Sequence, residues 1–193
     1  MRIGKEERKT KETDISVEWC LDGGGKCDIK TGLGFFDHML ELFAVHGRFD
    51  LTVKCKGDLK VDGHHSVEDV GIVLGKLLYK LLGDKKGITR YAAACIPMDE
   101  SLARSVIDIS GRPFLVFKGD FKGKIGDFDA QLIEEFFRAF ATYGMITAHI
   151  EILYGLNAHH MAEAAFKSFA RALKDAVAVT GSGSVLSSKG VLE

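Results

Sequence analysis

The chain has 193 residues, 46% of them hydrophobic and 27% charged, with only two prolines. This composition is typical of a compact globular protein and argues against an intrinsically disordered one. The net charge of −1 excludes a general electrostatic attraction to nucleic acid or to an anionic membrane, so an anionic ligand needs a local cluster of basic residues.

The first half of the chain reads as two strands joined by a turn, a short helix, a third strand and a second helix. These elements are predicted, in that order, at residues 13–21, about 25–30, 35–47, 49–56 and 64–82. Asp22-Gly23-Gly24-Gly25 would form a hairpin-type turn, Asp37 could cap the first helix and Gly47 could end it. The second helix carries an apolar stripe, which predicts that one side of it faces the core.

The second half repeats this order. Its elements are predicted at 92–97, 102–109, 113–118, about 129–143, 146–154 and, after the cap residue Asn157, in a final helix. Internal duplication is the simplest explanation, with halves of about 1–90 and 91–193 in a single domain. The expected class is α+β, with two β-β-α-β-α units. The Gly/Ser-rich tail is expected to be mobile unless a ligand or neighbour orders it.

The final helix of each half begins with the same histidine-rich tetrad. The two copies are His64-His65-Ser66-Val67-Glu68 and His159-His160-Met161-Ala162-Glu163. Positions four apart share one face of a helix, so the first histidine and the glutamate of each copy can bind one cation together. Imidazole and carboxylate together suit first-row divalent ions such as Mn, Fe, Co or Zn, and argue against Ca. A single copy is equally typical of an exposed first helical turn, but two matched copies favour metal binding.

Equivalent positions on the shorter helices offer one further ligand each. His38 precedes the first tetrad and Glu135 takes the matching place before the second, so each could complete a metal site; the alternative for Glu135 is a solvated helix carboxylate. His46 is better explained by the negative end of its helix dipole, and His149 by an exposed strand face.

Other common site types are not supported. The motifs HExxH, GxxxxGK[ST], strand-linked GxGxxG and GxSxG are absent. The four cysteines form no CxxC pair, which is typical of reduced thiols in a cytosolic protein. The charged N-terminus lacks an apolar signal segment, and no apolar run approaches the roughly 18 residues that span a bilayer. A cytoplasmic protein is expected.

Several segments resemble the imidazoleglycerol-phosphate dehydratase family in its monofunctional form. They are RKTKET (8–13), FFDHML (35–40), HHSVED (64–69), PMDESLA (97–103), SGRP (110–113), NAHHMAEAAFKSFARAL (157–173) and SSKG (187–190). The resemblance runs from about residue 5 to 192. It implies helices sandwiched between two four-stranded sheets, a fold similar to ribosomal S5 domain 2. It further implies 24-subunit shells, active sites between subunits and two Mn²⁺ per subunit.

The resemblance also implies a reaction and its residues. Water is removed from imidazole glycerol phosphate to give imidazole acetol phosphate in L-histidine biosynthesis, with the substrate imidazole on one metal. Glu12 matches a substrate-contacting glutamate and is the best candidate for general acid/base. Glu68 and Glu163 are expected metal ligands that could also transfer a proton. Asp99, beside Glu100, would either contact the metal ligands without binding the metal or transfer a proton. The metal ligands implied by the tetrads and the shorter helices are His38, His64, His65, Glu68, Glu135, His159, His160 and Glu163.

The phosphate would be held by four basic residues that fall where the family binds it, with Ser187 as a hydroxyl donor. The basic residues, each of which alone is typical of a surface cation, are Arg90, Arg112, Lys167 and Lys189. The sequence departs from the family pattern twice: Glu135 replaces a common histidine ligand and Leu42 replaces a glutamine. Neither the metal bound by each histidine nor the physiological metal follows from the sequence.

Three other functions fit the sequence less well. Another dinuclear-metal enzyme acting on a small phosphorylated metabolite lacks support, because carboxylate-rich hydrolase motifs are missing. A non-catalytic metal-binding assembly module would leave Glu12 and the phosphate cations without a purpose. RNA binding is disfavoured by the absence of a basic excess and of aromatic RNP-like runs.

Overall fold

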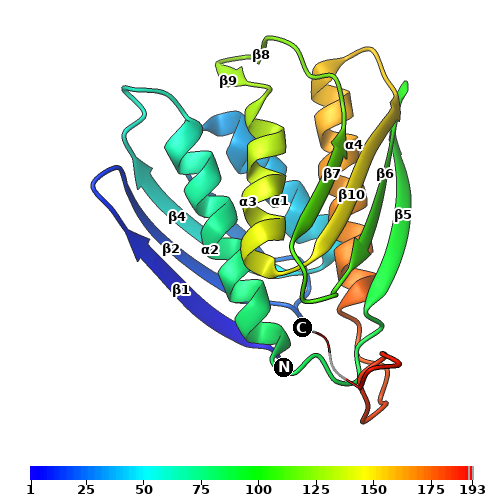
Figure 1. The fold of residues 1–193 in the computed structure, drawn as a ribbon. Coiled ribbons are helices and arrows are strands. Elements are labelled where there is room, and N and C mark those ends of the chain that lie inside the picture. Colours follow the sequence, from blue (N-terminus) through cyan, green and yellow to red (C-terminus); the bar gives the residue numbers. More distant parts are fainter. Residues whose placement is uncertain (191, 193) are drawn as a thin grey trace.

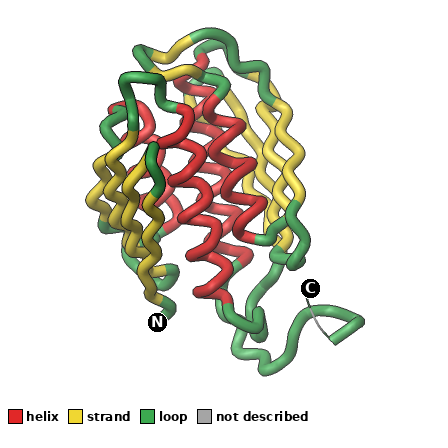
Figure 2. The backbone as a smooth tube through the Cα atoms, turned by 60° about the vertical axis from the view of Figure 1, so that its left-hand side comes forward, coloured by secondary structure: helices red, strands yellow, loops and turns green. Residues whose placement is uncertain are grey.

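A computed structural model describes residues 1–190 and 192, in which a layer of helices lies between two four-stranded sheets (Figures 1 and 2). The helices are α1 (Gly34–Gly47), α2 (His64–Leu82), α3 (Leu132–Gly144) and α4 (Ala158–Ala176). The first sheet contains β1 (Ile3–Lys9), β2 (Thr13–Cys20), β4 (Asp50–Gly57) and β3 (Cys27–Lys30), in this spatial order. The second contains β5 (Tyr91–Met98), β6 (Ser101–Asp108), β10 (Thr147–Tyr154) and β7 (Phe114–Lys118). The α+β sandwich that the sequence predicts is confirmed.

The two sheets have the same internal arrangement. Their first three strands in spatial order are antiparallel, and the last strand, β3 or β7, runs parallel to its neighbour. Alternating side chains of β2 and β4 are buried against the helices, because successive side chains of a strand point to opposite faces. Trp19 on β2 lies fully buried, edge-on to the rings of Phe43 and Phe49.

The strand count and two local features differ from the sequence-based expectation. The first half has three strands before α1, where two were predicted, because the charged segment β1 is also a strand. The predicted hairpin at 22–25 is wrong: β2 and β3 both pair with β4 and not with each other. Asp37 lies within α1 and accepts hydrogen bonds from Thr31, whereas Leu33 occupies the N-cap position. A short hairpin, β8 (Lys124–Ile125) with β9 (Phe128–Asp129), follows β7.

The helices of the two halves pack across the middle of the molecule. α2 lies against α3, and α1 lies against α4. The approach of α2 to α3 is close, because a Cβ atom on Gly75 would lie 2.7 Å from the Phe140 carbonyl oxygen. Each short helix therefore delivers its side chains to the long helix of the other half. Among the described residues, no helix has both the length and the apolar character that crossing a bilayer requires.

Candidate metal centre and active site

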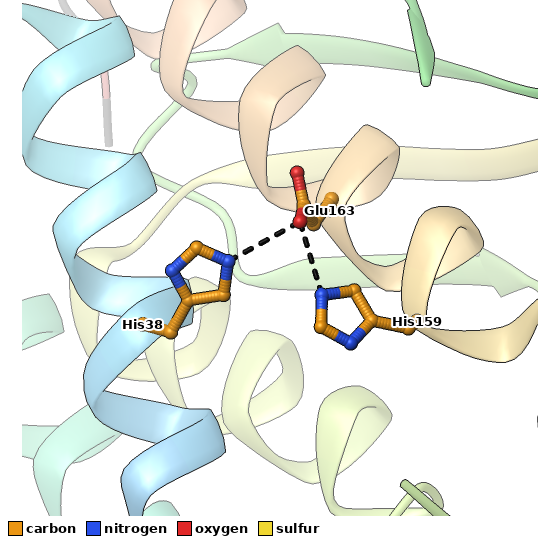
Figure 3. Close-up of side chains that lie close together, drawn as sticks. All are labelled: His38, His159 and Glu163. Carbon is orange, nitrogen blue, oxygen red and sulfur yellow. Dashed lines mark hydrogen bonds and ion pairs between the residues drawn. The ribbon is translucent and has the colours of Figure 1, made fainter. Parts of the chain in front are cut away.

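Three predicted ligands meet where α1 packs on α4. His38 Nε2 lies 3.2 Å from Glu163 Oε1, and His159 Nε2 lies 3.0 Å from the same oxygen (Figure 3). One ligand atom from each residue lies within 4.8 Å of the others. His38 comes from the first half and the other two residues from the second, so the helix packing between halves creates this cluster.

Local structure determines where these side chains lie. Asn157 caps α4 by accepting a hydrogen bond from the His159 backbone N–H at 2.9 Å, which confirms the predicted cap. His159 and Glu163 are one helical turn apart and share a face. The ring of Phe35 packs edge-on against His159 at 5.1 Å between centroids. A hollow of about 500 Å³ opens beside His38 and His159 and is bounded on another side by the β8–β9 hairpin.

The Glu163 carboxylate is held in its ionised form. Burial by itself would raise the pKa of this carboxyl, but hydrogen bonds from Lys167, His38 and His159 lower the pKa to about 2. Lys167 Nζ lies 2.5 Å from Oε2, on the side away from the histidines. Two imidazoles and one carboxylate are a donor set that would suit a first-row divalent ion.

The matching helix pair, α2 with α3, brings its predicted ligands together less completely. His64 Nε2 and Glu68 Oε2 are 3.6 Å apart, one turn from each other on α2. Glu135 on α3 lies 3.9 Å from the Arg138 guanidinium. Within residues 1–190 and 192, the only set of three potential ligands that converges to within 4.8 Å is the one at His38.

The second histidine of each tetrad is oriented by a carboxylate. His65 Nδ1 lies 3.1 Å from Asp58, and His160 Nδ1 lies 2.6 Å from Glu100. These hydrogen bonds raise the pKa of both imidazoles. In metal sites, a carboxylate on one ring nitrogen orients the other nitrogen toward the ion. Asp58 was not predicted as a site residue, because it precedes the tetrad in a loop and has no motif of its own.

Two further acidic residues face the outer nitrogens of these rings. Glu12, in the β1–β2 turn, lies 3.8 Å from His65 Nε2. Asp99, in the β5–β6 turn, lies 3.8 Å from His160 Nε2. The two halves thus place an exposed carboxylate beside the same nitrogen.

Comparisons with known proteins identify the family. A model of the imidazoleglycerol-phosphate dehydratase family matches residues 31–173. The chain is 58% identical over 195 residues to the imidazoleglycerol-phosphate dehydratase of Methylorubrum populi, with all of both chains covered. It is 56% identical over 194 residues to that of an Exiguobacterium species, again with full coverage. The chain belongs to the imidazoleglycerol-phosphate dehydratase family.

Solved structures of imidazoleglycerol-phosphate dehydratases have the same fold. The Staphylococcus aureus enzyme superposes with a TM-score of 0.81 at 43% identity, covering 92% of this chain and 100% of that one. The Pyrococcus furiosus enzyme, determined in complex with (S)-C348, superposes with a TM-score of 0.83 at 41% identity, covering 96% and 99%. The resemblance of the sequence segments to this dehydratase family is thereby confirmed.

Most residues predicted to bind the phosphate lie away from the cluster of His38, His159 and Glu163. Figure 1 shows the N-terminal ends of α2 and α4 at one end of the sandwich and the C-terminal tail at the other. Arg90 pairs with Asp108 at the tail end and donates to the Leu186 carbonyl oxygen at 2.6 Å. Ser187 lines the same 640 Å³ hollow as Arg90. Arg112 is exposed in the loop between β6 and β7.

Lys167 and Lys189 differ in their positions. Lys167 contacts Glu163 and is the one predicted phosphate ligand that lies beside the candidate metal ligands. Lys189 is exposed in the tail, where its backbone N–H donates to Ser187 Oγ. Leu42, in the position of a family glutamine, packs against the hydrophobic core and offers no polar contact.

Proposed function

We propose that this chain catalyses the elimination of water from imidazole glycerol phosphate to give imidazole acetol phosphate, as an Mn²⁺-dependent hydro-lyase of L-histidine biosynthesis. The observation that carries this proposal is the convergence of His38 and His159 on Glu163 in a chain of the dehydratase family. A catalyst for this reaction must bind an imidazole ring, remove a proton from the carbon beside it and expel a hydroxyl group.

The chain's own residues would hold the metal ions at two places. His38, His159 and Glu163 would bind one ion, with Lys167 keeping the far oxygen of Glu163 occupied. His64, Glu68 and Glu135 would contribute to the second place. His65 and His160 would each present Nε2 as a further ligand, because their Nδ1 atoms are engaged by carboxylates. Bound Mn²⁺ supplies Lewis-acid polarisation of the substrate imidazole and its neighbouring hydroxyl.

Glu12 is the best-placed residue for proton transfer. Its side chain is 54% exposed and accepts no hydrogen bond from any described residue, so the carboxylate is available to a substrate. It would take the proton from the carbon beside the imidazole and give it to the departing hydroxyl, which leaves as water. Asp99, which is 71% exposed, is the second candidate for these proton transfers.

The active site would be completed between subunits of a homo-oligomer. The segment before β5 that contains Arg90, the β6–β7 loop that contains Arg112 and the tail that contains Ser187 lie at one end of the sandwich. The β1–β2 turn, which contains Glu12, and the N-terminal end of α4 lie at the other end (Figure 1). One subunit therefore cannot place all of them on one small phosphorylated substrate. A neighbouring copy would supply the phosphate-binding groups, with the Gly/Ser-rich tail and Lys189 closing over the phosphate. The family suggests a 24-subunit assembly in the cytoplasm.

The proposal is tested by assaying the purified protein on imidazole glycerol phosphate. Activity should disappear after chelation and return on addition of Mn²⁺, and metal analysis should find roughly two divalent ions per subunit. Turnover that is unaffected by thorough removal of metal would contradict the proposal, as would a metal-replete protein with no activity.

A further inference from the structure

A buried carboxylate ties the turn that carries Glu12 to the helix that carries the first tetrad. Asp69 lies on α2 directly after Glu68 and is only 6% exposed. Its Oδ1 accepts a hydrogen bond from Arg8 Nε at 2.8 Å, and its Oδ2 accepts one from Thr13 Oγ1 at 2.5 Å. Arg8 and Thr13 flank the β1–β2 turn. One side chain on α2 therefore holds both ends of that turn.

The hydrogen bonds of this turn run in one direction. A carboxylate paired with a guanidinium has only acceptor oxygens, so the Thr13 hydroxyl must donate to Asp69. The Thr13 oxygen can then accept from the Thr10 hydroxyl, 3.3 Å away. Thr10 Oγ1 in turn accepts from the backbone N–H groups of Glu12 and Thr13, both at 3.0 Å. The backbone of Glu12 thus stands at the far end of a chain of hydrogen bonds that ends on Asp69.

The corresponding β5–β6 turn lacks this arrangement. The residue that follows the tetrad is Asp69 in the first half and Ala164 in the second. In the β5–β6 turn, Glu100 accepts hydrogen bonds from His160 Nδ1 at 2.6 Å and from two backbone N–H groups. The Glu100 carboxylate is occupied, whereas Glu12 and Asp99 each leave theirs exposed beside a histidine. The buried network is therefore present in the β1–β2 turn and absent from the β5–β6 turn.

We propose that Asp69 is a positioning residue, which acts through Thr13 and Thr10 to hold the Glu12 carboxylate beside the first tetrad. This inference rests on the proposed function, in which Glu12 transfers the proton. Asp69 itself is buried and does not touch the substrate. Arg8 pairs with the Asp69 carboxylate, so this buried side chain has a partner of opposite charge. A small displacement of Glu12 would lower the rate without changing how the phosphate binds.

The hydroxyl of Thr13 gives the most direct test, because it can be removed with little change of shape. Thr13→Val should lower kcat by about 10- to 100-fold with KM changed by less than about twofold, whereas Thr13→Ser should retain nearly full kcat. Manganese content and thermal stability are measured for both variants. Equal kcat values for the valine and serine variants would overturn the inference.

A double-mutant cycle shows whether Asp69 acts through Glu12. Asp69→Asn, Glu12→Gln and the double variant are compared, with Asp14→Asn as a control, since Asp14 is exposed in the same hairpin and pairs only with Lys9. Asp69→Asn should lower kcat in the wild-type background and have almost no further effect once Glu12 is glutamine. Losses that simply multiply would show that Asp69 has a separate, structural role, and the inference would fail.

The wild-type assay separates this inference from the proposed function. If the wild-type protein with Mn²⁺ does not turn over imidazole glycerol phosphate, the proposed function fails first. If it does and the cycle is multiplicative, only the role of Asp69 is wrong. Should Asp69→Asn fail to fold, the Thr13 pair still decides the question, because neither variant leaves a buried charge unpaired.

Discussion

The imidazole rings of His38 and His159 lie with their centroids 5.8 Å apart, although they come from different halves of the chain. Their Nε2 atoms face the same oxygen of Glu163. Neither half contains this ligand set alone. The packing of α1 on α4 therefore does more than bury apolar surface: it brings together the three residues of the candidate metal centre.

Removal of His38 should disable this centre and spare the other. In His38→Ala, only His159 and Glu163 remain at this place within the chain, so the manganese content should fall from about two ions per subunit toward one, and activity should be lost. Elemental analysis of the purified variant provides the measurement. His149→Ala is the matched control, because His149 is exposed on β10. An unchanged metal content in His38→Ala would show that His38 is not a ligand.

The long helices and their tetrads could be predicted from the sequence because their signals are local. The apolar stripe of α2 and the Asn157 cap of α4 each lie within a few residues of the feature they predict. The convergence of His38 on Glu163 depends on helix packing between the halves. The repeat suggested a third ligand, but no local pattern indicates which helix lies beside which.

The features that could not be predicted from the sequence depend on structure beyond the local pattern. β1 reads IGKEERK, which has no clear apolar alternation, and it becomes a strand because its backbone pairs with β2 at the edge of the sheet. β3 and β4 are parallel neighbours in the sheet, and α1 is the crossover connection that separates them in the chain. Asp58 reaches His65 from a loop. Each case depends on a partner that is distant in the chain or on a loop conformation.

Arg112 should affect substrate binding more than turnover. If Arg112 holds the phosphate, which is unchanged by the reaction, its contact stabilises the bound substrate and the transition state alike. Arg112→Ala should therefore raise KM by about 10-fold or more and leave kcat within about threefold. Steady-state kinetics measure both constants, and Arg104→Ala, which removes a surface ion pair with Glu151, is the control. A large fall in kcat at unchanged KM would contradict this role.

Asp22 should make stability depend on pH in the acid range. Hydrogen bonds from Arg2 lower the pKa of Asp22 to about 2, although burial alone would raise it. Because the folded pKa lies below the ordinary value of 3.8, the ion pair stabilises the fold above about pH 4, and this contribution is lost as the pH falls through 2. It amounts to at most about 2 kcal/mol before solvent screening.

Thermal unfolding between pH 6 and pH 2 tests this expectation. The difference in Tm between wild type and Asp22→Asn should be largest near neutral pH and shrink toward zero as the pH approaches 2. Asp28→Asn serves as the control, since Asp28 is half exposed and pairs only with Lys30 on the same strand. A difference in Tm that stays constant over the whole range would show that the charge of Asp22 is not responsible.

Two variants that are each nearly inactive should regain activity when they are co-expressed, if the active site forms between subunits. Glu12 lies in the β1–β2 turn, and the β6–β7 loop that contains Arg112 lies at the opposite end of the sandwich (Figure 1), so one complete site would draw them from different copies. Glu12→Gln and Arg112→Ala should each have little activity when the substrate is far below KM. Co-expressed in equal amounts, they should regain about a quarter of wild-type activity, because random mixing pairs an intact Glu12 with an intact Arg112 in about that share of sites. A chain carrying both substitutions, co-expressed with itself, controls for expression and assembly. Activity of the mixture equal to the mean of the two single variants would mean that both residues serve the same subunit, which the distance between the two ends of the fold argues against.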